Sequence, residues 1–160
     1  PEDSDLTFQN ILKKISSTNS IGIFIRRSDY VNNNKINAIH GYCDINYYKN
    51  AINYINQKKG ETEIFIFSDD LEWCAETFQN NNYNYINVNS KKKYMDLILL
   101  KNCKYIISSN STFSWWAAYL NENKDKVIIV PNKWFKIDRL KKNLMDLIPP
   151  NWVKLENTLL

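Results

Sequence analysis

The chain has 160 residues, of which 44% are hydrophobic, and its formal net charge at pH 7 is +4. These values are typical of a globular domain that buries its own core, and they argue against a disordered chain. No apolar run reaches about 18 residues, so the sequence predicts no membrane-spanning helix. The lysines are scattered, and the one dense run, Lys91–Lys93, is typical of a solvated helix start. We therefore expect a local anion site and no nucleic-acid partner.

The cysteines indicate the redox compartment. Cys43, Cys74 and Cys103 are widely spaced, and their odd number argues against a disulfide framework. The simpler interpretation is a reducing, cytoplasmic compartment.

Short β-branched apolar runs alternate with stretches of helical spacing along the chain. Asp44 and Asp70 are suitable N-caps for two of the helices, and Gly60 is a suitable stop for the first of them. The asparagine triplets at 32–34 and 80–82 are interpreted as turns. In chain order, the pattern predicts a helix at 6–15, a strand at 20–25, a helix at 44–58, a strand at 63–67, a helix at 70–79, a strand at 85–88, a helix at 94–101, a strand at 105–107, a helix at 112–120, a strand at 127–130 and a short helix at 139–147.

Strands of this length separated by helices indicate βαβ units and a parallel sheet. We expect an α/β fold, a Rossmann-like, doubly wound and mainly parallel sheet of about five strands. One domain is expected over 1–160. It would have an N-terminal helix and linker at 1–19, a core at 20–130, and a C-terminal tail at 131–160 packed on the core.

Polar clusters follow three of the predicted strands at their carboxyl ends, where parallel sheets bind ligands. The clusters are RRSD at 26–29, SDD at 68–70 and SSNST at 108–112. Only three of the 21 basic residues are arginines, so the adjacent pair Arg26 and Arg27 indicates bidentate recognition of phosphate. Hydroxyl and N–H groups at a helix start also suit phosphate, whereas aspartates suit the donors of a ribose or a guanine edge.

Each cluster also has a structural alternative. Successive strand residues point to opposite faces, so one arginine could pair with Asp29 or Asp69 and position the other. RRSD could be a surface ion pair, and SDD could be only a helix N-cap. No GxGxxG or Walker A motif is present, so no ordinary NAD or ATP site is expected. The helix at 112–120 is expected to pack against the core through its aromatic side chains, which are Trp115, Trp116 and Tyr119.

Six segments resemble, in order, the glycosyltransferase family 11 α-1,2-fucosyltransferases. They are IRRSDYV, IHGYCDINYYKNAI, IFIFSDDLEWC, SSNSTFSWWAAYLN, VIIVPNKWF and DLIPPNWVKL, and they cover nearly all of Ser20 to Leu155. The resemblance implies inverting transfer of fucose from GDP-fucose to a galactoside hydroxyl of a surface glycan such as lipopolysaccharide, with no metal or cofactor. It also implies a GT-B arrangement of two Rossmann-like domains, of which this chain matches the C-terminal, donor-binding half. By resemblance to bacterial members, the protein is expected to act at the cytoplasmic face of the membrane and to associate with that membrane peripherally.

The resemblance also assigns roles to residues. It implies that Arg26 and Arg27 bind the pyrophosphate and that Asp29 is an orienting or catalytic carboxylate. The family's arginine motif usually has histidine where this chain has Phe24, and glycine where it has Ser28, so a ring nitrogen near the phosphates is absent here. The substrate-binding residues implied near the nucleoside are Ser68, Asp69 and Asp70, and those near the phosphates or the fucose are Asn110, Ser111, Thr112 and Ser114.

Several alternatives remain open at this stage. The only histidine, His40, has a suitable reference pKa for a general base, but the pattern puts it in a loop after an asparagine run. The chain could instead be a degenerate domain that binds a nucleotide sugar without catalysis. It could also belong to a transferase with another donor, because basic strand ends serve many nucleotide sugars, or be a plain interaction module.

Overall fold

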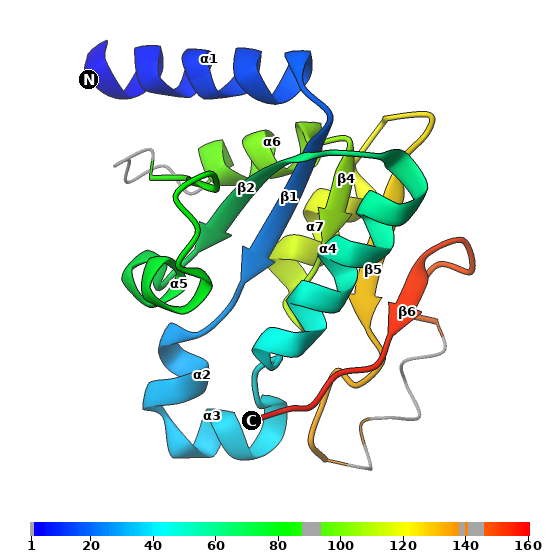
Figure 1. The fold of residues 1–160 in the computed structure, drawn as a ribbon. Helices are drawn as coiled ribbons and strands as arrows, with labels where there is room; N and C mark the ends of the chain where they lie inside the picture. Colours follow the sequence, from blue (N-terminus) through cyan, green and yellow to red (C-terminus); the bar gives the residue numbers. More distant parts are fainter. Residues whose placement is uncertain (1, 88–93, 138–139, 141–145) are drawn as a thin grey trace.

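The computed structural model describes residues 2–87, 94–137, 140 and 146–160. They form a central sheet covered by helices on both faces (Figure 1). The elements are α1 (Glu2–Ser17), β1 (Ser20–Ile25), α2 (Ser28–Asn32), α3 (Asn34–His40), α4 (Ile45–Lys59), β2 (Glu63–Ser68), α5 (Leu71–Phe78), β3 (Asn84–Tyr85), α6 (Tyr94–Asn102), β4 (Tyr105–Ile107), α7 (Thr112–Tyr119), β5 (Val127–Pro131) and β6 (Val153–Leu155).

The strand order in the sheet is β3-β2-β1-β4-β5-β6, and every neighbouring pair is parallel. The chain therefore adds β2 and β3 on one side of β1, and then crosses to the other side of β1, where it adds β4, β5 and β6. This is the Rossmann order, whose direction reverses between the first and fourth strands. The expected Rossmann-like α/β fold is confirmed, and the β1–β4 boundary is where such sheets open a crevice for ligands.

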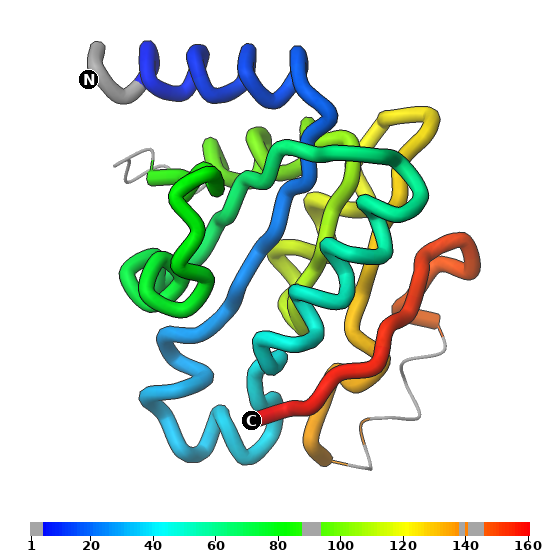
Figure 2. Tube along the Cα trace, in the orientation of Figure 1, coloured from blue at the N-terminus to red at the C-terminus, as the bar shows by residue number. Residues whose placement is uncertain are grey.

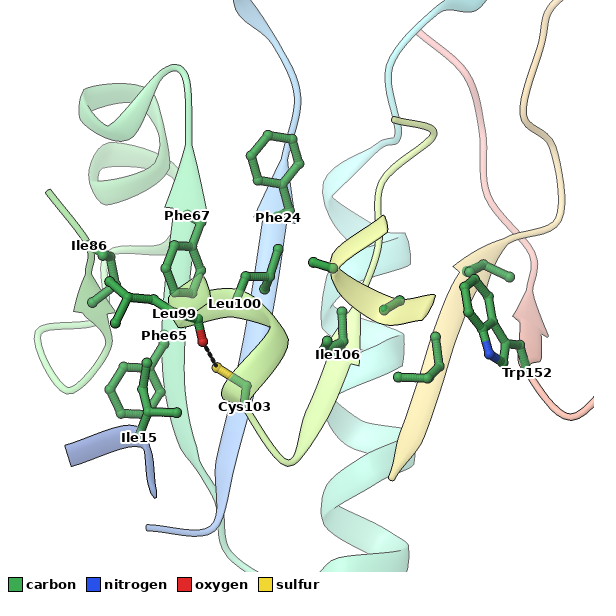
Figure 3. Packing of buried hydrophobic residues seen from close by; sticks show 14 of the residues in the cluster. Ile15, Phe24, Phe65, Phe67, Ile86, Leu99, Leu100, Cys103, Ile106 and Trp152 are labelled. Atoms are coloured by element: carbon green, nitrogen blue, oxygen red, sulfur yellow. Dashed lines mark hydrogen bonds between the residues drawn. The ribbon is translucent and has the colours of Figure 1, made fainter. Parts of the chain in front are cut away.

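The two faces of the sheet are covered by different helices because side chains alternate along β1. Ile21, Ile23 and Ile25 lie on the face covered by α4 and α5. Phe24 lies on the opposite face, with core residues from α1, α6 and α7. Figure 3 shows this second layer, with Phe24 at the end of β1 that lies away from Cys103. The alternation decides which helices the residues after β1 meet.

Helix ends follow the sequence signals closely. Asp44 Oδ1 accepts hydrogen bonds from the backbone N–H groups of Asn46 and Tyr47, at 2.9 and 3.2 Å. Gly60 follows the same helix with φ 78°, a conformation that favours glycine. All three cysteines are free and buried.

Three parts of the pattern differ from expectation. The sheet of the described chain has six strands, because Val153–Leu155 adds β6 beside β5. The segment after β1 forms the short helices α2 and α3, and Asn33 caps α3 by accepting from the N–H groups of Lys35 and Ile36. His40 is therefore the last residue of a helix and not part of a loop. Lys91–Lys93 and most of the helix predicted at 139–147 lie outside the described residues.

Helix α6 approaches the sheet closely at Gly22. A Cβ atom at this position would lie 2.7 Å from both Cys103 Sγ and Leu100 Cδ1. Both neighbours are fully buried, so neither has space to retreat. Glycine is required here by the packing distance between strand and helix.

We expect Gly22→Ala to lower the free energy of unfolding by about 1–3 kcal/mol, because the added methyl group overpacks the contact with α6. Urea unfolding followed by circular dichroism measures the change. The double variant Gly22→Ala/Cys103→Ala should recover part of the loss. A single variant as stable as the wild type would show that α6 is not packed against β1 in this way.

Candidate functional site

The three polar clusters meet at one edge of the sheet. Strands β2, β1 and β4 are neighbours, with Ile25 of β1 opposite Ser68 of β2 and Ile23 opposite Ile107 of β4. Beyond this edge the chain continues from β1 into α2 and α3, and the C-terminal segment returns beside α3 (Figure 2). Leu160 fixes that return through two backbone hydrogen bonds with Tyr42. The predicted convergence of the clusters is present.

Arg26 continues the face of β1 that carries Phe24, and it lines a cavity. Its Nη2 lies 2.8 Å from Asp29 Oδ1, and its Nη1 lies 3.0 Å from Asp69 Oδ2. The side chain remains 33% exposed, so its guanidinium is still accessible. The cavity, about 210 Å³, is lined by Phe24, Arg26, Ser68, Asp69, Asp96 and Phe113.

Arg27 points to the opposite face and is packed. Only 11% of its side chain is exposed, and its Nε donates to Asp70 Oδ2 at 3.2 Å. The guanidinium lies 3.7 Å from the ring centre of Trp73 and 5.1 Å from that of Tyr42. Such contacts are worth up to about 2 kcal/mol when desolvated. Arg27 therefore joins the end of β1 to the start of α5, and it does not line the cavity.

The SDD cluster divides between structure and cavity. Ser68 Oγ donates to the carbonyl of Ile25 and accepts from the N–H of Asp70, both at 2.9 Å. Asp70 caps α5 by accepting from the N–H of Trp73 at 3.2 Å. The N-cap alternative thus describes Asp70, whereas Asp69 lies on the cavity wall and accepts from the backbone N–H of Arg27 at 2.8 Å.

Most of the cluster before α7 is buried and hydrogen-bonded internally. Asn110 is 1% exposed, and its Nδ2 donates to the carbonyls of His40, Gly41 and Trp134, each at 3.1 Å. Ser114 is fully buried, and its Oγ lies 2.8 Å from that of Ser108.

The accessible part of this cluster is the helix start itself. Ser111 is the N-cap of α7 but makes no side-chain capping bond, and Thr112 is exposed. Among the predicted ligands of this cluster, Asn110 and Ser114 shape the loop, Ser111 is only 7% exposed, and Thr112 is the one whose side chain is exposed.

A group of aromatic residues that do not line the cavity begins beside Arg26. The guanidinium lies 5.5 Å from the ring centre of Tyr30, and the Tyr30 ring stacks on His40 with centres 5.1 Å apart. Phe135 also contacts the imidazole, with ring centres 5.3 Å apart. Burial lowers the pKa of His40, and the charge of Asp29 opposes this shift.

Two walls of the cavity were not predicted from the sequence. Phe113 is in ring contact with Phe24 at 4.7 Å. Asp96 reaches the cavity from α6, and its position as the lone acid within the apolar run MDLILL was a usable signal. Within the described ranges, no cluster of three or more His, Cys, Asp or Glu residues could hold a metal ion.

The aromatic residues of α7 do not all pack as expected. Trp115 packs against the core, and its Nε1 donates to the carbonyl of Leu147 at 2.7 Å. Trp116 and Tyr119 are 51% and 56% exposed. The packing interpretation therefore holds for Trp115 and is wrong for the other two.

Comparison with known proteins identifies the family. The profile of Glycosyl transferase family 11 matches residues 4–156. The chain belongs to glycosyl transferase family 11. This family match extends over the strands and the helices that build the cavity.

Similar curated proteins agree with this family. An O-antigen biosynthesis glycosyltransferase, WbnK, of Escherichia coli is 39% identical over 150 residues, which cover 91% of this chain and 48% of the relative. An alpha-1,2-colitosyltransferase of Escherichia coli is 36% identical over 161 residues, 98% of this chain and 54% of the relative. Galactoside 2-alpha-L-fucosyltransferase SEC1 of Bos taurus is 26% identical over 120 residues, 70% of this chain and 33% of the relative.

The family 11 chain spans about half the length of the two bacterial relatives. In the described part of the chain, no helix is both long enough and apolar enough to cross a bilayer.

The two arginines should respond differently to substitution by lysine. Arg27→Lys loses the planar stacking on Trp73 and the Nε bond to Asp70, so we expect a loss of about 2 kcal/mol in unfolding free energy. This loss corresponds to a fall in Tm of roughly 4–8 °C. Arg26→Lys is the matched control and should change stability by less than about 1 kcal/mol, because its ion pairs are partly solvated. Differential scanning calorimetry measures both, and equal losses would contradict the division of roles.

Proposed function

We propose that the cavity at the carboxyl ends of β1 and β2 binds the nucleotide of a GDP-linked deoxy sugar. The natural protein that carries this chain then transfers the sugar, with inversion, to a galactoside hydroxyl of a surface glycan. The observation that carries the proposal is the position of Arg26, which lines a cavity together with an aromatic pair and two carboxylates. Family 11 membership and the names of the relatives support the same activity.

The walls of the cavity suit guanine better than other bases. Phe24 and Phe113 offer an apolar, aromatic surface for a planar ring. Asp96 and Asp69 line the cavity with carboxylates, which only accept hydrogen bonds when ionised, and Oδ2 of Asp69 is buried beside Arg26. The Watson–Crick edge of guanine presents two adjacent donors, N1–H and N2–H₂, to such a group, whereas the adenine edge presents one donor beside an acceptor.

Arg26 and the start of α7 suit the diphosphate. Arg26 has five N–H donors, so it can bind a phosphate oxygen and keep one carboxylate partner. It pairs with two carboxylates, those of Asp29 and Asp69, and shares the cavity with that of Asp96, so a diphosphate must replace part of this pairing. The N–H groups at Ser111 and Thr112 add donors at the positive end of the α7 dipole.

The chemistry assigned to this arrangement is a single displacement. The acceptor hydroxyl attacks the anomeric carbon while the bond to the diphosphate breaks, so negative charge grows on the departing GDP. Arg26 and the helix start bind that charge more strongly in the transition state than in the ground state, which accelerates the reaction. Phe24 contributes no charge where the family motif usually has histidine, so Arg26 and the helix start supply the groups that stabilise the negative charge on the departing GDP.

A second donor is favoured by one comparison. The bacterial relative named as an alpha-1,2-colitosyltransferase covers 98% of this chain. Colitose differs from fucose by the absence of the 3-hydroxyl group, so one site could accept both sugars. GDP-colitose is therefore the second candidate donor beside GDP-fucose, with the same nucleotide and the same linkage.

Nucleotide selectivity tests the cavity directly. We expect GDP to raise the Tm of this chain more than ADP, UDP or CMP at equal concentration, because binding to the folded state stabilises it by mass action. Asp69→Asn should weaken GDP binding by about tenfold or more, because it removes a carboxylate from the cavity wall and the charge that holds Arg26 at 3.0 Å. Glu72→Gln, an exposed change on α5, is the matched control. Equal shifts with every nucleotide would contradict a guanine site.

Transfer by the natural protein tests the reaction. Incubation with GDP-fucose or GDP-colitose and a galactoside should give a product whose anomeric configuration, read by NMR, is opposite to that of the donor. Arg26→Ala should reduce kcat about 100–1000-fold, while Lys49→Ala, an exposed change on α4, should not. GDP binding without any transfer would instead support a non-catalytic nucleotide-sugar domain.

A further inference from the structure

Helix α7 exposes two large aromatic side chains in its second half. Trp116 is 51% exposed and Tyr119 is 56% exposed. Single apolar residues on a protein surface are common and need no explanation. These two rings, however, line one and the same hollow, and aromatic residues that gather at an exposed hollow mark a binding surface.

The hollow lies between α7 and the segment 146–150, which precedes β6. Its volume is about 540 Å³, which is within the range of ligand pockets. Its walls combine aromatic rings and aliphatic side chains with the exposed carboxylate of Asp146. Largely apolar walls with a few polar groups are typical of a site that binds a small organic ligand.

Trp115 holds the two walls together. Its Nε1 donates to the carbonyl of Leu147 at 2.7 Å, and its ring centre lies 5.8 Å from that of Trp152. The N–H of Trp152 in turn donates to the carbonyl of Pro149 at 3.0 Å. The hollow is therefore preformed, which reduces the entropy that a ligand loses when it binds there.

The exposed rings form a corner. The Tyr119 ring stacks on Trp115, with centres 5.0 Å apart and an interplanar angle of 9°. The Trp116 ring lies at 88° to the Trp115 ring and at 85° to the Tyr119 ring. A pyranose ring suits such a corner, because its C–H face packs on an aromatic ring. Its hydroxyl groups can then donate to a carboxylate such as that of Asp146.

The hollow lies on the same helix as one wall of the proposed donor site. Phe113 lines the cavity, and Trp116, three residues later, lines the hollow. Residues at this spacing are neighbours on a helix surface. With a rise of about 1.5 Å per residue, Tyr119 lies about 9 Å beyond Phe113 along the helix axis. This distance is comparable with the length of a disaccharide, so a glycan that ends at the cavity can extend along α7 into the hollow.

We propose that the hollow lined by Trp116 and Tyr119 is a subsite for the acceptor glycan and holds the sugar residues that adjoin the accepting galactoside. This inference rests on the proposed transferase function and adds a determinant of acceptor length to it. The two rings supply stacking surfaces, and Asp146 accepts hydrogen bonds from sugar hydroxyls. Contacts this far from the reacting atoms bind the substrate and the transition state equally, so they lower KM and leave kcat unchanged.

Kinetics of the natural protein with acceptors of two lengths test the subsite. The acceptors are methyl β-galactoside and a tetrasaccharide that ends in the same galactoside. Trp116→Ala and Tyr119→Ala should each raise KM for the tetrasaccharide about 3–10-fold, the effect of losing one aromatic contact. The kcat value and the KM for methyl β-galactoside should stay within about twofold. Trp116→Phe keeps a flat ring and should retain most of the affinity.

Tyr94→Ala is the matched control. Tyr94 is an aromatic residue of α6 with a similar exposed fraction, 53%, and it does not line the hollow. This variant should leave KM for both acceptors unchanged.

NMR of this chain tests binding without catalysis. The indole N–H signal of Trp116 is assigned by its loss in Trp116→Phe. We expect the tetrasaccharide to move this signal, and methyl β-galactoside at equal concentration to move it less, because the subsite binds the residues that only the longer acceptor carries.

The outcomes separate this inference from the function on which it rests. Transfer by the wild type with no change of KM in Trp116→Ala and Tyr119→Ala would overturn the subsite and leave the function standing. Absence of transfer with a moved Trp116 signal would overturn the function and leave the glycan site standing. Absence of both would overturn both. If Trp116→Ala lowers the Tm of the natural protein but not that of this chain, the surface packs against another part of that protein, and the glycan subsite is overturned.

Discussion

The alternation of side chains along β1 continues past the end of the strand, and the rest of the site depends on it. Arg26 follows Phe24 onto one face and reaches the cavity, while Arg27 follows Ile25 onto the other and is enclosed by Trp73 and Tyr42. The two adjacent arginines thus have different roles. In the proposed function one guanidinium binds the substrate, and the other holds α5 so that Asp69 lies beside the first.

The charge around Arg26 is unusual for a site expected to bind phosphate. Carboxylates outnumber the accessible guanidinium, and the rings that line the cavity, Phe24 and Phe113, are apolar. This composition suits a ligand with two parts, a base that donates hydrogen bonds and a diphosphate that accepts them. It also gives Arg26 a preformed orientation, because Asp29 and Asp69 hold it in place before the ligand arrives, which reduces the entropy lost on binding.

The fold and the meeting of the three polar clusters could be predicted from sequence because long apolar runs and caps such as Asp44 carry strong local signals. Strand β6 could not, since three residues with alternating exposure give no apolar run and their pairing with β5 is a tertiary effect. The same limit applies to Asn110 and Ser114, whose polar groups are buried by internal hydrogen bonds. A sequence shows that a hydroxyl or an amide is present, but the packing decides whether it faces a ligand.

The central claim is that Arg26, and not Arg27, meets the diphosphate at the mouth of the parallel sheet. A crystal structure of this chain with GDP tests it most directly. The account predicts a guanine base against Phe24 and Phe113, with phosphate oxygens within hydrogen-bond distance of Arg26 and of the start of α7. A nucleotide bound at the opposite edge of the sheet, or one held by Arg27 with Arg26 still on both aspartates, would contradict it.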